Sequence, residues 1–267
     1  MNGELRIADL NEAERAWLKG FFEETRARLE RLVDAHGMKP GLGLALAAER
    51  IAILDHQLAA LGTAMVDAGT PVACAKGCAF CCTLTIDVSP DEVFALAQYL
   101  ETHLAAEALE GVKARARAND AKAHGLPPLE RHRLRLFCPV MDPATRACLA
   151  HAARPNPCQG YLSLDVKACE ADHLAPPGRV AKPAAAALLT NLVGDLRSQI
   201  LAEHGAPDAR VELTAALVAL WRDGETETAW LHGSPVFPDS AAYGATTYTA
   251  ESTGDIKSMG TDRSGAI

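Results

Sequence analysis

The chain has 267 residues, of which 49% are hydrophobic, and its formal net charge is −8. Its length is sufficient for one large or two small domains. The negative charge argues against general nucleic-acid binding, because that function needs a basic surface to neutralise phosphates. The N-terminus lacks the pattern of a secretory signal, and no apolar run reaches the ~18 residues of a membrane span. We therefore expect a soluble cytoplasmic protein with no membrane partner.

Alanine and leucine dominate the apolar content, which favours helices over strands. Residues 9–37 and 40–69 carry apolar side chains at helical spacing, and a capping sequence at Asp9 and Glu12 predicts the start of the first helix. The sequence from Ser89 to Glu92 predicts another helix start, with a serine cap, a proline at the first helical position and a glutamate at the third.

Two further stretches rich in alanine and leucine, after Pro183 and after Asp208, predict two more helices. Residues 83–88 hold β-branched side chains in near alternation and predict a short strand. The fold class expected is therefore mainly α: a helical bundle with a cysteine-rich metal-binding loop region and at most a few short β-strands.

The predicted domain organisation is one helical domain over residues 1–232, which contains the cysteine cluster region 74–169. Residues 233–267 contain no leucine and are rich in serine, threonine, glycine and alanine. Such a composition cannot bury enough apolar surface to offset the entropy of ordering, so this segment is predicted to be a disordered tail.

The cysteines are the strongest functional signal, since all 8 lie in one segment and four of them fall within nine residues. Disulfides are disfavoured in a cytoplasmic protein, and thiolates are the preferred ligands of zinc, copper(I) and iron–sulfur clusters. The pattern therefore predicts a metal centre. Its candidate ligands are Cys74, Cys78, Cys81, Cys82, Cys138, Cys148, Cys158 and Cys169.

The adjacent Cys81 and Cys82 are difficult to direct at a single ion, which leaves open two metals, a bridging thiolate, or one ligand with a reserve thiol. Eight thiolates could also form two four-cysteine sites. Three histidines in the same region could each replace a thiolate: His132, His151 and His173. The 138–169 segment contains several prolines that forbid a long helix, so we expect the metal to hold it in place.

Residues 111–137 hold seven lysines and arginines against two acids. This run is either a solvated surface or a patch that binds anions or faces the metal centre. Arg131, Arg133 and Arg135 alternate with other residues, so a strand there would direct three guanidinium groups to one side. Cations that could offset the charge of a thiolate centre are Lys76, Arg154 and Lys167.

The cysteine pattern resembles the YkgJ family, a group of CxxxCxxCC proteins described as zinc- or iron-chelating. The first block matches from Cys74 to Cys82, and the second matches at Cys138-Pro139, at Cys148 and from Arg154 to Cys158. His151 stands where the family usually has an aromatic residue, and Gln159 where it usually has an arginine. The resemblance implies metal binding and a largely helical fold, without an established reaction.

We therefore predict a protein that binds zinc or iron, as ions or as an iron–sulfur cluster, in a structural or metal-handling role. One alternative is an iron–sulfur-dependent enzyme such as a protein lysine N-methylase using S-adenosylmethionine, because flagellin lysine N-methylase carries a related cysteine pattern. The C-x3-C-x2-C spacing also occurs in radical enzymes that use S-adenosylmethionine, but those enzymes need alternating strands and helices. A second alternative is a thiol-redox sensor. No catalytic residue, substrate or protein partner is indicated.

Overall fold

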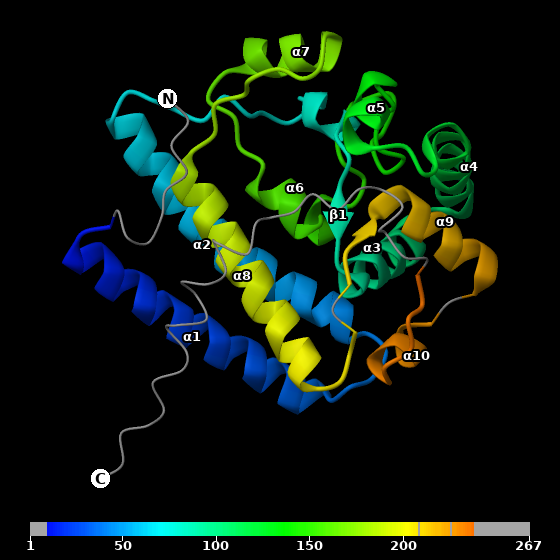
Figure 1. Cartoon of the computed structure of the whole chain (residues 1–267), viewed down its shortest axis with the longest axis horizontal. Helices are drawn as coiled ribbons and strands as arrows, with labels where there is room; N and C mark the ends of the chain where they lie inside the picture. Colours follow the sequence, from blue (N-terminus) through cyan, green and yellow to red (C-terminus); the bar gives the residue numbers. More distant parts are fainter. Residues whose placement is uncertain (1–9, 208, 225, 238–267) are drawn as a thin grey trace.

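The computed structural model describes residues 10–207, 209–224 and 226–237. Helices dominate these residues, and the sheet that they contain has only two strands, which confirms the predicted mainly α fold (Figure 1). In chain order the elements are α1 (Glu12–His36), α2 (Leu42–Asp67), the 3-10 helix η2 (Phe80–Thr83), β1 (Asp87–Val88), α3 (Pro90–His103), α4 (Ala106–Ala123), α5 (Pro128–Arg133), the 3-10 helix η3 (His151–Ala153), α6 (Asn156–Gly160), α7 (Val166–Leu174), α8 (Ala184–Glu203), β2 (Val211–Glu212), α9 (Leu213–Asp223) and α10 (Glu227–Leu231).

The three longest helices, α1, α2 and α8, lie against one another along one side of the molecule (Figure 1). Each presents an apolar stripe to the other two, as the helical spacing predicted. We call the apolar cluster between them the first core. It includes Leu18, Leu29, Leu54, Leu192 and Leu196, which are at most 1% exposed.

A second core lies between α3, α4 and α9 and includes Val88, Leu96, Val112 and Leu217. Helix α3 contributes to both cores, because its Phe94 packs in the first while Leu96 packs in the second. Helix α3 therefore lies between the two cores and packs against both. This matters for the cysteines, because the segments that carry them are attached around the N-terminal end of that helix (Figure 1).

The helix starts follow local capping chemistry. Helix α1 is capped by Asn11 and not by Asp9 as predicted: the Asn11 side chain accepts from the Glu14 N–H at 2.9 Å, and Glu14 accepts from the Asn11 N–H at 2.8 Å. The predicted capping box at Ser89 is confirmed, with the Ser89 N–H donating to Glu92 at 3.1 Å.

The predicted strand over residues 83–88 is mostly wrong. Only Asp87 and Val88 form β1, which pairs antiparallel with β2 so that Val88 lies opposite Val211. The preceding residues turn instead, because η2 occupies Phe80–Thr83 and the Thr83 hydroxyl donates to the Phe80 carbonyl at 2.8 Å. Such a local bond offers the backbone an alternative to a strand.

The division into a domain over residues 1–232 and a tail over 233–267 stays a prediction. Residues 233–237 continue onto the body, where Val236 is 6% exposed and belongs to the first core. Residues 238–267 lie outside the described part of the chain. Within the described residues, no helix combines the length and apolar character that crossing a bilayer requires.

Candidate metal centre

Short elements and loops carry the eight cysteines, and none of the cysteines lies on α1, α2, α3 or α8. All eight are free thiols. The loop after α2 holds Cys74 and Cys78, and η2 holds Cys81 and Cys82; the connection from α5 to η3 holds Cys138 and Cys148, α6 holds Cys158 and α7 holds Cys169. In Figure 1, α5 and α7 lie toward the top of the view, and α6 lies below them, nearer the middle of the molecule.

Backbone hydrogen bonds join the Cys82 region to the downstream cysteines. The Cys138 N–H donates to the Cys82 carbonyl at 2.7 Å, and the Met141 N–H donates to the Cys138 carbonyl at 3.0 Å. Met141 in turn forms an antiparallel bridge with Cys148. Both Cys138 and Cys148 pack against the second core. Three cysteines that are far apart in sequence are thus held by one small backbone network.

Ser163 joins two other cysteines. Its N–H donates to the Cys74 sulphur at 3.2 Å, and its carbonyl accepts from the Ala73 N–H at 2.8 Å. The Ser163 side chain also hydrogen-bonds the Cys169 thiol, and its hydroxyl donates to the Asp165 carbonyl at 3.0 Å, just before α7 begins. Ser163 is 1% exposed, so these bonds form away from water. The loop after α2 and helix α7 are thereby fixed to the same buried residue.

The adjacent thiols Cys81 and Cys82 contact each other. Because the Cys82 S–H donates to the Cys81 thiolate, the pKa of Cys81 is lowered to about 7. The same contact raises the pKa of Cys82, and burial adds to that rise. Helix η2 therefore holds one sulphur that is readily ionised beside one that is not. A thiolate is the form that binds metals and reacts as a nucleophile.

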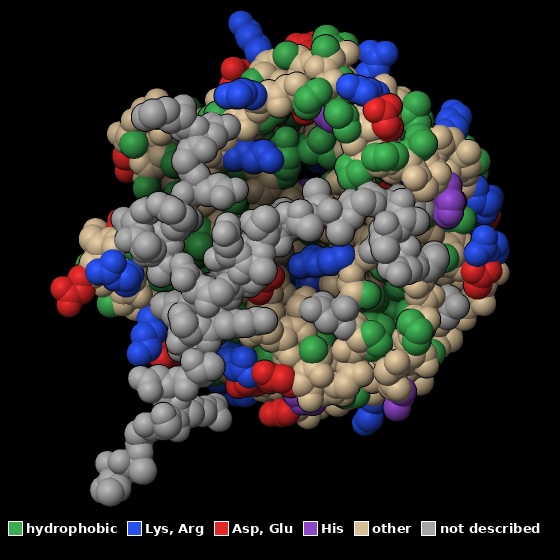
Figure 2. Space-filling model, viewed as in Figure 1, with side chains coloured by type: hydrophobic (Ala, Val, Ile, Leu, Met, Phe, Trp, Pro, Cys, Tyr) green, Lys and Arg blue, Asp and Glu red, His purple; other side chains and the backbone are tan. Residues whose placement is uncertain are grey.

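Cys158 is largely enclosed by protein atoms and yet accessible. Burial raises the pKa of its thiol well above the ordinary value, with smaller contributions from the charges of Cys138, Cys148 and Cys81, yet its side chain is exposed. The thiol can therefore be reached from outside although protein atoms make up most of its surroundings. Figure 2 shows a hollow in the surface below the segments at the top of the view, where Figure 1 places α7.

The thiols do not converge on a single point. Among the described residues, no three side chains of His, Cys, Asp or Glu lie close enough together to hold one metal ion. The donor set nevertheless suits a soft metal, because eight free thiols from separate segments lie close enough to act electrostatically on one another. A metal would have to draw them inward, and each bound thiol would release its proton.

The three histidines proposed as substitute ligands contact other side chains. His173 lies beside the rings of Phe80 and Phe137, with centroids 5.7 and 5.5 Å away, and its Nδ1 is 3.3 Å from the Thr83 hydroxyl. His151 contacts the Arg154 guanidinium. The Nε2 of His132 is 3.9 Å from an oxygen of Asp172.

The predicted strand of alternating arginines is wrong, because residues 128–133 form the helix α5. Pro128 at the first helical position favours this start. Arg131 is buried; it forms an ion pair with Glu212 at 2.9 Å and donates a hydrogen bond to the Thr214 hydroxyl at 2.8 Å. Arg133 pairs with Glu130 on the same helix at 2.6 Å. The guanidinium groups therefore point in different directions, and Arg131 ties α5 to β2.

Two residues near the thiols, Tyr161 and Lys182, are not indicated by any sequence pattern. The Lys182 ammonium lies over the Tyr161 ring, 4.1 Å from its centroid. Burial lowers the pKa of Lys182, while the charges of Asp172, Cys169 and Cys81 oppose that effect. Lys182 is thus a cation beside Cys81 and Cys169 that would offset the negative charge of a thiolate centre. It comes from the connection before α8, outside the cysteine region.

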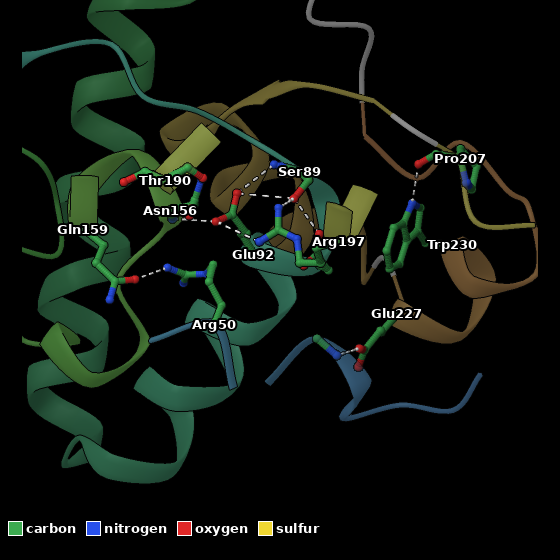
Figure 3. Close-up of polar contacts among 12 residues, drawn as sticks. Arg50, Ser89, Glu92, Asn156, Gln159, Thr190, Arg197, Pro207, Glu227 and Trp230 are labelled. Atoms are coloured by element: carbon green, nitrogen blue, oxygen red, sulfur yellow. Dashed lines mark hydrogen bonds and ion pairs between the residues drawn. The ribbon is translucent and has the colours of Figure 1, made fainter. Parts of the chain in front are cut away.

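A buried charged network fixes the segment that carries Cys158 (Figure 3). Arg197 on α8 is fully buried and lies 3.1 Å from Asp91 and 3.2 Å from Glu92. Glu92 accepts a hydrogen bond at 2.6 Å from the N–H of Asn156, the first residue of α6. Cys158 follows two residues after Asn156, on the same short helix. A sequence cannot reveal such a network, because its members come from three distant helices.

The second half of this network explains the glutamine at position 159. Arg50 on α2 is fully buried and donates to the Gln159 side chain at 2.6 Å and to the Arg154 carbonyl at 2.6 Å (Figure 3). An arginine at position 159 would place two guanidinium groups together, whereas the glutamine oxygen accepts from Arg50. Burial lowers the pKa of Arg50 to about 10, and the charge of a Cys158 thiolate is one of the smaller effects that oppose this, so the guanidinium lies near that sulphur.

Comparison with known proteins gives one match. Residues 73–174 match the family model described as "CxxCxxCC: Putative zinc- or iron-chelating domain". The matched segment contains every cysteine of the chain. This supports the predicted metal-binding character of the cysteine region, with a metal ion as its partner. The comparisons with curated proteins and with solved structures gave no match.

Proposed function

We propose that this protein binds zinc or iron through its cysteine thiolates, and that the bound metal serves a structural or metal-handling role. The proposed ligands are drawn from Cys74, Cys78, Cys81, Cys82, Cys138, Cys148, Cys158 and Cys169. The observation that best supports the proposal is that eight free thiols lie close enough to act electrostatically on one another, within the segment that matches the chelating-domain model. The assignment to the YkgJ family rests on the same spacing.

The chain's own residues would position and balance such a metal. The Cys138 and Cys148 backbone is anchored on the second core, and the Arg50 and Arg197 network fixes the start of α6. Lys182 would offset thiolate charge from one side. A bound zinc or iron would supply the bonds that connect these loops, because the loops bury little apolar surface themselves.

Metal analysis of protein purified without oxygen tests the proposal. We expect at least one zinc or iron per chain, lost when Cys74, Cys78, Cys81 and Cys82 are replaced by serine. Ala75→Ser is the matched control, because it places a hydroxyl on the same loop and leaves all thiols in place. Folded wild-type protein that contains no metal would contradict the proposal. Absorption identifies the metal: an iron–sulfur cluster is brown and bleaches on reduction, whereas a zinc protein is colourless.

The contact between Cys81 and Cys82 favours a second candidate, a thiol-redox sensor. The Cys81 thiolate could attack peroxide to give a sulfenic acid, and a neighbouring thiol would then displace water to form a disulfide. Thiol titration after mild peroxide distinguishes the two functions. A sensor loses two thiols per chain and regains them with a reductant, and Cys81→Ser does not, whereas a count that stays unchanged excludes the sensor.

A further inference from the structure

Helices α5 and α7 lie close together and carry exposed apolar side chains. Of the six large apolar side chains that are exposed in the described residues, four lie on these helices or directly after α5: Leu129, Leu134, Val166 and Leu174. The two helices approach each other where the Nε2 atom of His132 is 3.9 Å from an oxygen of Asp172. Figure 2 shows apolar and basic side chains beside one another over the part of the molecule where Figure 1 places these helices. Exposed apolar side chains that gather in one place indicate an interaction surface.

Two aromatic rings support a cation beside α7. The guanidinium of Arg146 lies over the rings of Phe80 and Phe137, 5.4 and 5.5 Å from their centroids. His173 on α7 contacts the same two rings. Arg146 is exposed, and a guanidinium over an aromatic ring keeps its N–H groups available to oxygen acceptors. The arginine is thus held next to α7 and can still bind an anion.

Arg135 supplies a second cation to the same place. It follows Leu134 at the end of α5 and, like Arg146, it is exposed. The charges of both arginines lower the pKa of His173, in addition to the larger effect of burial, so both lie near that ring. Among the described residues, neither arginine forms an ion pair with an acidic side chain.

The acidic side chains of this region hydrogen-bond other partners. Asp142 accepts from the Thr145 hydroxyl at 2.6 Å, and Asp172 accepts from the Gly178 N–H at 2.5 Å. The two guanidinium groups are therefore available to a carboxylate from another molecule.

The backbone of both arginines lies in the left-handed region, with a φ of 53° at Arg135 and 57° at Arg146. They are the two residues other than glycine that have a positive φ in the described part of the chain. Glycine adopts this conformation at little steric cost and is the residue favoured directly after a helix end, where Arg135 stands. Arginine at both positions indicates that its side chain serves a purpose beyond the local fold.

We propose that this surface binds an acidic segment of another protein that also carries apolar side chains. We call it the docking surface, and it consists of Leu134, Arg135, Arg146, His173 and Leu174. Carboxylates of the partner would pair with the two guanidinium groups, and its apolar side chains would cover the two leucines. Because the chain has a net charge of −8, a local excess of positive charge would also orient an acidic partner toward this surface. The inference does not depend on the proposed metal.

Fluorescence anisotropy of a labelled peptide of alternating glutamate and leucine tests the proposal on the full chain. Arg135→Glu/Arg146→Glu should weaken binding by about tenfold or more, because two charge pairs are lost. The same variant should gain affinity for a peptide with lysine in place of glutamate. The matched control is Arg31→Glu/Arg117→Glu, which changes the net charge equally at exposed arginines of α1 and α4 and should bind as wild type.

A second variant separates binding from folding. Arg135→Gly/Arg146→Gly suits the left-handed backbone, so its thermal unfolding midpoint should not fall, yet peptide binding should weaken as in the glutamate variant. Leu134→Ser/Leu174→Ser should weaken binding severalfold, which distinguishes docking from attraction between charges alone.

Three results would overturn the proposal: no peptide binding by wild type, an equal loss in the matched control, or tighter binding of an RNA oligonucleotide of the same charge. Metal content is measured on the same samples. Metal-free protein that still binds the peptide would contradict the proposed function and leave the docking surface intact.

Discussion

The helical body and the cysteine region are held together by different forces. In the body, α1, α2 and α8 bury leucines against one another, and burial of each such side chain contributes roughly 1.5–3 kcal/mol. The cysteine region consists of short helices and loops tied by single hydrogen bonds and by the buried Arg50 and Arg197 network. The body should therefore be stable by itself, whereas the stability of the cysteine region should depend on what its thiols bind.

Metal removal gives the largest expected difference between the two regions. After chelation under reducing conditions, trypsin should cleave rapidly at Arg146 and Lys167, because the loops lose the bonds that we propose to hold them. The body should be cut slowly with or without chelator. Mass spectrometry of the early fragments measures this, with chelator presaturated with zinc as the control. Equal resistance in both samples would contradict a metal-held loop.

Loss of a buried charge at the junction of the two regions should have the next largest effect. Arg197→Met leaves Asp91 and Glu92 buried without their closest cation, at a cost of about 3–5 kcal/mol in the free energy of unfolding. Urea denaturation measures the change. Arg26→Met is the control, since it removes only ion pairs with Glu30 and Glu203 near the surface and should cost about 0–1 kcal/mol. Comparable losses in both variants would show that the network contributes little.

Gly194 on α8 packs against the Asn156 side chain, so replacing it with alanine should have the opposite effect to the usual glycine-to-alanine change in a helix. Alanine normally stabilises a helix interior by about 0.5–1 kcal/mol relative to glycine, and Gly62→Ala should do so because nothing lies within 4 Å of the added carbon. Gly194→Ala should instead destabilise by roughly 1–3 kcal/mol, because its Cβ would lie 2.6 Å from the Asn156 amide nitrogen. Thermal unfolding of both variants checks the opposite signs. Stabilisation by both would mean that Asn156 moves freely.

Acid should weaken the same junction by a smaller amount. Burial alone would raise the pKa of Glu92, but the positive charges of Arg197 and Arg50 have a larger, opposite effect and lower this pKa from 4.5 to about 2. A lowered carboxylate pKa stabilises the fold fully above pH 4.5, and this contribution is lost as the pH falls toward 2. Burial raises the pKa of Asp91, which has the opposite effect and offsets part of the loss.

Glu92→Gln tests this titration. The variant is less stable than wild type near neutral pH, and the difference should shrink as the pH falls below 4.5, because wild type then loses the same charge. Urea denaturation at several pH values measures it. A difference that stays constant down to pH 2 would show that Glu92 does not titrate in this range.

Local features were predictable from the sequence because nearby residues determine them. The Ser89 capping box, the apolar stripes of the long helices and the mainly α class all depend on contacts within a few turns. The errors were also local: the cap is at Asn11, and turns or helices replace the strands predicted at residues 83–88 and around Arg131. In the two strand predictions, a short-range hydrogen bond or a proline overrode the β pattern.

The grouping of eight cysteines in one segment already indicates metal chemistry, because residue type and spacing are enough to suggest it. Which thiols are neighbours, and which residues support them, depends on the tertiary fold. Cys138 lies beside Cys82 through a backbone bond across 55 intervening residues, and Ser163 and Lys182 reach the thiols from loops that resemble ordinary surface. Such long-range contacts depend on how the two cores pack, and no local pattern records them.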